Sequence, residues 1–91
     1  MPNTIGTDTI GMNTTWETKE KFLQKTFEFK NFQEALDFVN KVGKIAEELQ
    51  HHPDISIKNY KQVFISTTTH SAENTITEKD HSLTQAIDAL I

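Results

Sequence analysis

The chain has 91 residues, no cysteine and a formal net charge of −4 at pH 7, from nine Lys and Arg against thirteen Asp and Glu. This length fits one domain, and the lack of cysteine excludes disulfides and a thiolate zinc site. An acidic chain without a basic stripe is not expected to bind nucleic acid. No apolar run approaches the roughly 18 residues of a membrane span, so we expect a cytoplasmic location and no membrane partner.

Residues 1–15 contain five Thr and two Gly but no Lys, Arg or long apolar run. They fit neither a signal peptide nor a transit peptide, and their polar composition predicts a flexible leader. The folded domain is expected to cover residues 16–91.

The first predicted elements are two short strands between Trp16 and Phe29, joined by a turn at residues 19–21. Phe27 and Phe29 are two residues apart, so they share one face of the second strand.

A long helix is predicted near residues 31–50. Asn31 is a good N-cap, and Glu34 can reach back to complete a capping box. Apolar residues then recur at three- and four-residue steps, which is typical of one buried helix face. The helix is expected to stop near His51, because Pro53 disfavours the helical conformation at the residue before it.

Two antiparallel strands are predicted within residues 54–69, where apolar and polar residues alternate around a turn at residues 58–59. A second helix follows near residues 77–90, with Thr77 as its N-cap and Asp80 at the third helical position. Its apolar stripe consists of Leu83, Ala86, Ile87 and Leu90. This order predicts an α+β fold, a four-stranded antiparallel sheet with two helices packed on one face.

Three of the four histidines lie where elements end. His51 and His52 follow the long helix, and His70 follows the last strand. Neighbouring side chains diverge unless the backbone bends, and Pro53 offers a reason for a bend. Histidine suits proton transfer near neutral pH, so these residues could hold an acid and a base around one substrate. The alternative is that the imidazoles only cap the last helical carbonyls; His81 is interpreted as a surface residue.

Other residues have competing interpretations. Glu47 and His51 share a helix face, and His70 could complete a metal site. No HExxH pattern is present and adjacent histidines rarely point at one ion, so we expect no metal. Asp80 is either an acid at a helix N-terminus or a carboxylate that orients a histidine. Trp16 belongs either to the core or to a cleft.

The ordered spacing of these residues resembles the pterin-4a-carbinolamine dehydratase family. The resemblance covers Trp16 to Leu90. It is carried by Glu47, His51-His52-Pro53, Tyr60, His70 and Asp80, by the aromatic run Phe27 to Phe32, by Ala35, Phe38, Val42 and Ala46 on the helix, and by Thr68-Thr69-His70.

The resemblance implies dehydration of 4a-hydroxytetrahydropterin, the 4a-carbinolamine, to quinonoid dihydropterin, as in tetrahydrobiopterin-type cofactor recycling. It implies no metal or organic cofactor, a small-molecule pterin substrate, and a homodimer or homotetramer. The apolar width that Phe38 and Ile45 add to the long helix is compatible with such an interface.

Site residues follow from the same resemblance. The implied catalytic residues are His51, His52 and His70. The implied substrate-binding residues are Glu47, Asp80, Trp16 and Thr69. One imidazolium and one neutral imidazole can protonate the leaving 4a oxygen and remove the N5 proton. The assignment of acid and base among the histidines stays open.

One segment departs from the family pattern. Members usually follow the histidine equivalent to His70 with an acidic residue and a Gly-Leu-Thr run, whereas residues 71–77 here contain no glycine and are one residue longer before Asp80. Asn74 could supply the left-handed turn instead. The resemblance also leaves a second function open, that of an interaction module, because family members act in animals as dimerisation partners of a transcription factor.

Overall fold

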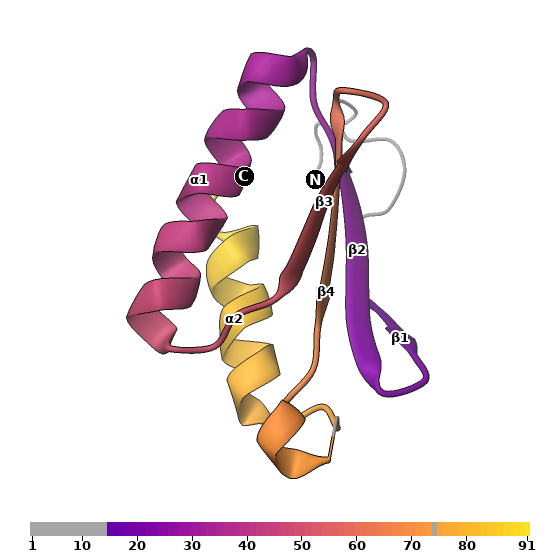
Figure 1. Cartoon of the computed structure of the whole chain (residues 1–91), viewed down its shortest axis with the longest axis vertical. Helices are drawn as coiled ribbons and strands as arrows, with labels where there is room; N and C mark the ends of the chain where they lie inside the picture. Colours follow the sequence, from indigo (N-terminus) through magenta and orange to yellow (C-terminus); the bar gives the residue numbers. More distant parts are fainter. Residues whose placement is uncertain (1–14, 74) are drawn as a thin grey trace, which may run out of the picture.

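Four strands form one antiparallel sheet, and both helices lie on the same face of it (Figure 1). This computed structural model describes residues 15–73 and 75–91. Its elements are β1 (Glu17–Lys19), β2 (Phe22–Glu28), α1 (Phe32–Leu49), β3 (Asp54–Lys58), β4 (Gln62–Thr67), the 3-10 helix η2 (His70–Ala72) and α2 (Glu78–Asp88). The α+β fold predicted from the sequence is confirmed. The predicted leader, apart from Thr15, and Asn74 lie outside the described residues.

The strand order is β1-β2-β4-β3, so β4 lies between its hairpin partner β3 and the earlier strand β2. The pairing places Leu23 opposite Thr67 and Ile55 opposite Ile65. Because β2 and β4 run antiparallel, the last residues of β4 reach the same end of the sheet as the start of β2. This end lies beside the beginning of α2 (Figure 1).

The core fills the space between the sheet and the two helices. Phe38 of α1 is only 4% exposed, and its ring centroid lies 4.8 Å from that of Phe27 and 4.9 Å from that of Phe29. Ile45 also packs against the core. The expectation that Phe38 widens α1 toward an interface is therefore wrong, because its side chain is buried within the subunit. Ile45 is only partly buried, so for this residue the expectation stays a prediction. The other fully buried apolar residues are Ala35, Val42, Val63, Ile65, Leu83 and Ile87.

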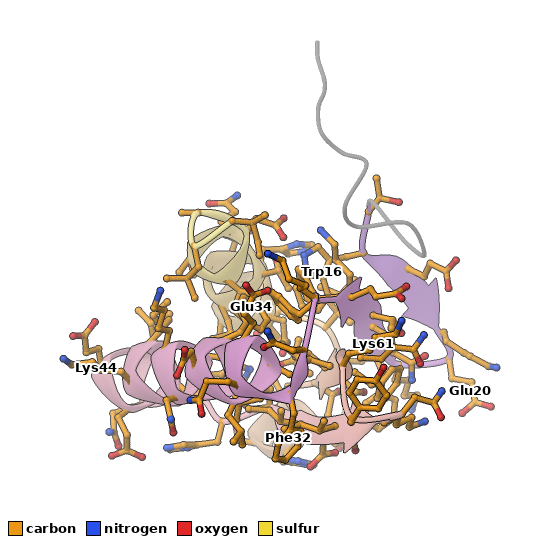
Figure 2. The ribbon with its side chains drawn as sticks, turned by 90° about the horizontal axis from the view of Figure 1, so that it is seen from above. Trp16, Glu20, Phe32, Glu34, Lys44 and Lys61 are labelled. Atoms are coloured by element: carbon orange, nitrogen blue, oxygen red, sulfur yellow. The ribbon has the colours of Figure 1, made fainter. Side chains whose placement is uncertain are left out.

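The helix caps largely follow the sequence. Thr77 and Asp80 form the capping box at the start of α2. At α1 the Asn31 side chain accepts from the Glu34 N–H at 2.9 Å, but Glu34 accepts from the N–H of Lys30 rather than from that of the N-cap itself. Figure 2 shows Glu34 and Lys44 on the outer surface of α1, with Phe32 at its beginning. Within the described ranges, neither helix is long and apolar enough to cross a membrane.

Candidate active site

The chain reverses direction sharply between α1 and the first site histidine. Gln50 adopts the left-handed conformation (φ 53°). Its N–H donates to the Glu47 carbonyl, and the N–H of His51 donates to the Ala46 carbonyl at 3.1 Å. This pair of bonds is the Schellman arrangement of a helix C-terminus. The bend therefore lies at Gln50, not at the His52-Pro53 step. Backbone N–H groups satisfy the carbonyls of Ala46 and Glu47, two of those that the imidazoles could otherwise cap.

This turn sends the two adjacent histidines into different surroundings. The His51 side chain is 10% exposed, and its Nε2 lies 2.7 Å from Oδ1 of Asp80, whose side chain is fully buried. The His52 side chain is 56% exposed, and its Nε2 lies 2.6 Å from Oε2 of Glu47, which is itself well exposed. The first pair is held inside the fold and the second lies on its surface.

Asp80 is the centre of the buried site. Its Oδ1 accepts from His51 and from the Thr67 hydroxyl at 2.7 Å. Its Oδ2 accepts from the Thr69 hydroxyl at 2.6 Å and from the Thr77 N–H at 2.9 Å. Burial alone would raise the pKa of Asp80, but these hydrogen bonds to the charged form outweigh it and lower the pKa from 3.8 to about 2. Asp80 is thus an anion at neutral pH, and it is both a helix cap and the partner of a histidine.

Thr69, one of the predicted substrate-binding residues, is buried and bonds Asp80. It is 4% exposed, its hydroxyl bonds Asp80 and lies 2.7 Å from that of Thr77, and its backbone N–H donates to the Thr75 carbonyl. The altered loop after His70 therefore still delivers Asp80 to His51. Sequence reasoning missed Thr67, although the alternation of Val63 and Ile65 already placed it on the core-facing side of β4.

His70 begins η2 and is exposed, directly after the buried Thr69. His70 is therefore next in the chain to a residue whose hydroxyl bonds Asp80. His81 is exposed on α2, as interpreted from the sequence.

Trp16 lies at the other end of α2. Its indole Nε1 donates to the carboxylate of Asp88 at 3.1 Å, and its ring meets that of Phe27 edge-on. Asp80 and Asp88 are eight residues apart, which is about 12 Å along a helix. The structure therefore does not bring Trp16 against the His51–Asp80 pair. Lys25, another residue that sequence reasoning missed, bonds Asp88 at 2.9 Å from the core-facing side of β2.

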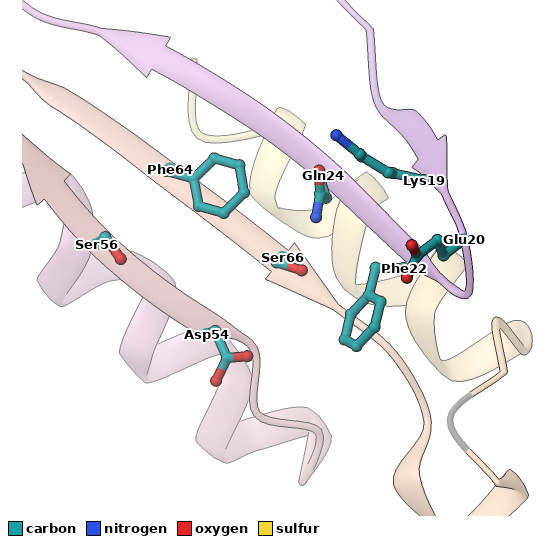
Figure 3. A pocket seen from close by; sticks show the side chains of 8 residues that line it. All are labelled: Lys19, Glu20, Phe22, Gln24, Asp54, Ser56, Phe64 and Ser66. Atoms are coloured by element: carbon teal, nitrogen blue, oxygen red, sulfur yellow. The ribbon is translucent and has the colours of Figure 1, made fainter.

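An open hollow of about 320 Å³ lies on the opposite face of the sheet, which the helices leave uncovered (Figure 3). The rings of Phe22 and Phe64 flank it, and Ser66 lies between them. The predicted site residues lie elsewhere. The remaining lining residues are Lys19, Glu20, Gln24, Asp54 and Ser56.

A metal site from Glu47, His51 and His70 is the alternative that the sequence raises. In the structure Glu47 pairs with His52, whereas His51 pairs with Asp80. Among residues 15–73 and 75–91, no group of three or more His, Asp or Glu is placed to hold a metal ion.

Comparison with known proteins places the chain. Residues 6–90 match the family described as pterin 4 alpha carbinolamine dehydratase. A protein of Thermomicrobium roseum, provisionally named a pterin-4-alpha-carbinolamine dehydratase, is 47% identical over 75 residues, covering 82% of this chain and 78% of its own. A protein of Sulfolobus acidocaldarius with the same provisional name is 43% identical over 75 residues, covering 82% of this chain and 80% of its own.

Two solved structures share the fold. One, from Brucella melitensis, is described as a transcriptional coactivator/pterin dehydratase; it is 32% identical, has a TM-score of 0.74, and the match covers 81% of this chain and 79% of that one. The other is described as a pterin dehydratase-like RuBisCO assembly factor of the alpha-carboxysome; it is 22% identical with a TM-score of 0.70, covers 85% and 89% of the two chains, and shows the fold alone. The extent of the family match and the identity to these relatives lead to one conclusion: this chain belongs to the pterin-4-alpha-carbinolamine dehydratase family.

Proposed function

We propose that this protein dehydrates 4a-hydroxytetrahydropterin to quinonoid dihydropterin by histidine acid–base catalysis, as a lyase of tetrahydrobiopterin-type cofactor recycling. The reaction removes the 4a hydroxyl as water and the proton from N5. The observation that supports the proposal most strongly is His51, nearly buried and bonded at 2.7 Å to an ionised carboxylate that the fold holds rigidly. Such a pair orients an imidazole for proton transfer.

The proposed roles follow from exposure and bonding. His51 exchanges a proton with the substrate while Asp80 orients it. His52 is exposed, and its 2.6 Å contact with Glu47 restricts the orientation of its imidazole. The family resemblance, and not the exposure or bonding of these side chains, assigns His52 and His70 to the substrate pocket of His51. There one neutral imidazole would remove the N5 proton and one imidazolium would protonate the leaving oxygen. Trp16 as a substrate contact stays a prediction, since it lies at the far end of α2.

The decisive assay is stopped-flow measurement of 4a-carbinolamine breakdown with and without the protein. His51→Ala should reduce the catalysed rate about 10²–10⁴-fold, the usual range for general acid–base catalysis. His52→Ala and His70→Ala should also slow it, by less where a neighbouring imidazole substitutes. His81→Ala is the matched control and should be nearly silent. Equal damage from His81→Ala and His51→Ala would count against the proposal, and so would a loss of activity in a chelator.

An interaction module with weak catalysis is the second candidate. The observation that favours it is the likeness to the Brucella melitensis protein, which is described as a transcriptional coactivator as well as a pterin dehydratase. The buried His51–Asp80 pair suits acid–base catalysis but also stabilises the fold, so the carbinolamine assay distinguishes the two candidates. Wild-type protein that left carbinolamine breakdown at its uncatalysed rate would favour the module.

We further propose that the protein forms a homodimer or homotetramer. Phe32 and Leu49, at the two ends of α1, are 49% and 44% exposed, and Tyr60 is 60% exposed. The sheet also ends in β1 and β3, whose outer edges can pair with another strand. Sedimentation showing only monomer at micromolar concentration would contradict this proposal.

A further inference from the structure

The Asp80 carboxylate has its hydrogen-bonding capacity filled from several parts of the fold. Oδ1 receives His51 and Thr67, and Oδ2 receives Thr69 and the Thr77 N–H. A carboxylate offers about four acceptor positions, so each oxygen is fully used. Rotation of the group would break bonds to β4 and to the α2 N-terminus together. The fold therefore fixes not only where Asp80 lies but which oxygen faces His51.

This geometry determines where the His51 proton resides. An ionised carboxylate accepts hydrogen bonds and cannot donate them. The 2.7 Å contact between Oδ1 and Nε2 therefore requires a proton on Nε2. In a neutral imidazole one nitrogen is protonated and the other is an acceptor, so Nδ1 has the free lone pair.

We propose that Thr67 and Thr69 are positioning residues which, through Asp80, keep the His51 proton on Nε2 and leave Nδ1 as the nitrogen that exchanges a proton with the substrate. The role of Nδ1 toward a substrate rests on the proposed dehydratase function, whereas the proton assignment on His51 does not depend on it. The two threonines act on different oxygens. Thr67 shares Oδ1 with His51, and Thr69 shares Oδ2 with the helix N–H.

The Asp80→Asn variant tests the proton assignment on His51 directly. The N–H of Thr77 is a backbone donor that cannot change its role, so the amide of the new residue must turn its carbonyl oxygen toward Thr77 and Thr69. Its NH₂ group then faces His51 and Thr67. The Thr67 hydroxyl can rotate to accept, but His51 can accept only if its proton moves from Nε2 to Nδ1. The substitution should therefore reverse the tautomer of His51 without unfolding the protein.

The test is ¹⁵N NMR of histidine-labelled full-length protein, with His51 assigned by its loss in His51→Ala. Spectra are taken at alkaline pH, beyond the point at which the histidine ¹⁵N shifts stop changing with pH. Wild type should show a protonated Nε2 and a bare Nδ1 at His51, and folded Asp80→Asn should show the reverse. A wild-type Nδ1–H tautomer, or an unchanged tautomer in Asp80→Asn, would overturn the assignment.

The threonines are tested kinetically. Thr67→Val and Thr69→Val should lower kcat about 10–100-fold, as removal of groups that orient metal-bound histidines does, with little change in KM, and Thr67→Ser and Thr69→Ser should restore it. A loss of thermal stability with kcat intact in both Val variants would overturn their positioning role. An inactive wild-type protein with the Nε2–H tautomer would overturn the proposed function but support the proton assignment.

Discussion

The two ends of α2 each present a carboxylate to the sheet, and they do so in opposite ways. Asp80, in the first turn, is fully buried and receives bonds from His51, Thr67, Thr69 and a backbone N–H. Asp88, the last residue of the helix, is 44% exposed and receives a lysine ammonium and the Trp16 indole. In the first pair the carboxylate of Asp80 is buried. In the second pair the carboxylate of Asp88 is partly exposed, and its partner Lys25 is buried.

The helix dipole accounts for part of this difference. A carboxylate is favourable at a helix N-terminus and unfavourable at a C-terminus. Asp88 is therefore placed against the dipole, and the ammonium of Lys25 at 2.9 Å offsets this. Lys25 lies between Leu23 and Phe27 on β2 and is 7% exposed as a residue, with Nζ 4.8 Å from the centroid of the Phe27 ring. Its stem fills core space while its charge reaches toward the rim. Asp80 therefore orients the His51 side chain, whereas Asp88 neutralises the charge of Lys25.

Loss of Asp80 should have the largest effect on stability. Asp80→Ala leaves His51 and two threonine hydroxyls without their buried acceptor and removes half of a capping box, so we expect a loss of about 3–5 kcal/mol in the free energy of unfolding. Urea denaturation measures it. A loss no greater than that of Asp88→Ala would show that burial does not distinguish the two ends.

The second-largest expected effect is a loss of folding stability at low pH, where Asp80 becomes protonated. The pKa of Asp80 is lowered in the fold from 3.8 to about 2, so the native state favours the charged form. Its contribution is present above the unfolded pKa and is lost as the pH falls through the folded one. The expected loss is about 2 kcal/mol between roughly pH 5 and pH 1. Asp80→Asn should lack this component in the same titration, and an unchanged acid profile in that variant would contradict the prediction.

Asp88→Ala should have an intermediate effect. It leaves the Lys25 ammonium without its acceptor and frees the Trp16 indole. We expect a loss of about 1–2 kcal/mol, because the lysine can reach solvent once released. Trp16 is the only tryptophan in the chain, so its fluorescence should change with this variant and not with His81→Ala.

Lys25→Met should have the smallest effect, within about 1 kcal/mol in either direction. An apolar side chain of similar length fills the same space and leaves Asp88 with water and the Trp16 indole as its partners. Such replacements of buried ion pairs are often neutral or stabilising. Thermal unfolding of Lys25→Met and Asp88→Ala, measured side by side, checks this expected difference in stability. A loss larger than that of Asp88→Ala would mean that the ammonium, not the stem, is what the core requires.

Much of the fold could be predicted from local patterns. Thr77 and Asp80 of the capping box are three positions apart, and Val63 and Ile65 are two positions apart, so short-range sequence determines both features. The exceptions are also local. The end of α1 lies where the sequence predicts it, but the bend after it lies at Gln50, a non-glycine residue in a left-handed conformation, and not at Pro53. The sequence pattern favours an interface for Phe38 because the width of a helix face does not show how much of it one sheet covers.

The elements, their caps and the kinds of residue at the site were predictable from local sequence, because each of these depends on neighbours within a few positions. The pairing of site residues depends instead on the packed fold. His51 meets Asp80 across 29 residues of chain, and Lys25 meets Asp88 across 63. The first contact follows from the position of β4 between β2 and β3, which brings Thr67 and the start of α2 to the end of α1. That order is set by the burial of side chains from all the elements at once, and no single segment contains the information.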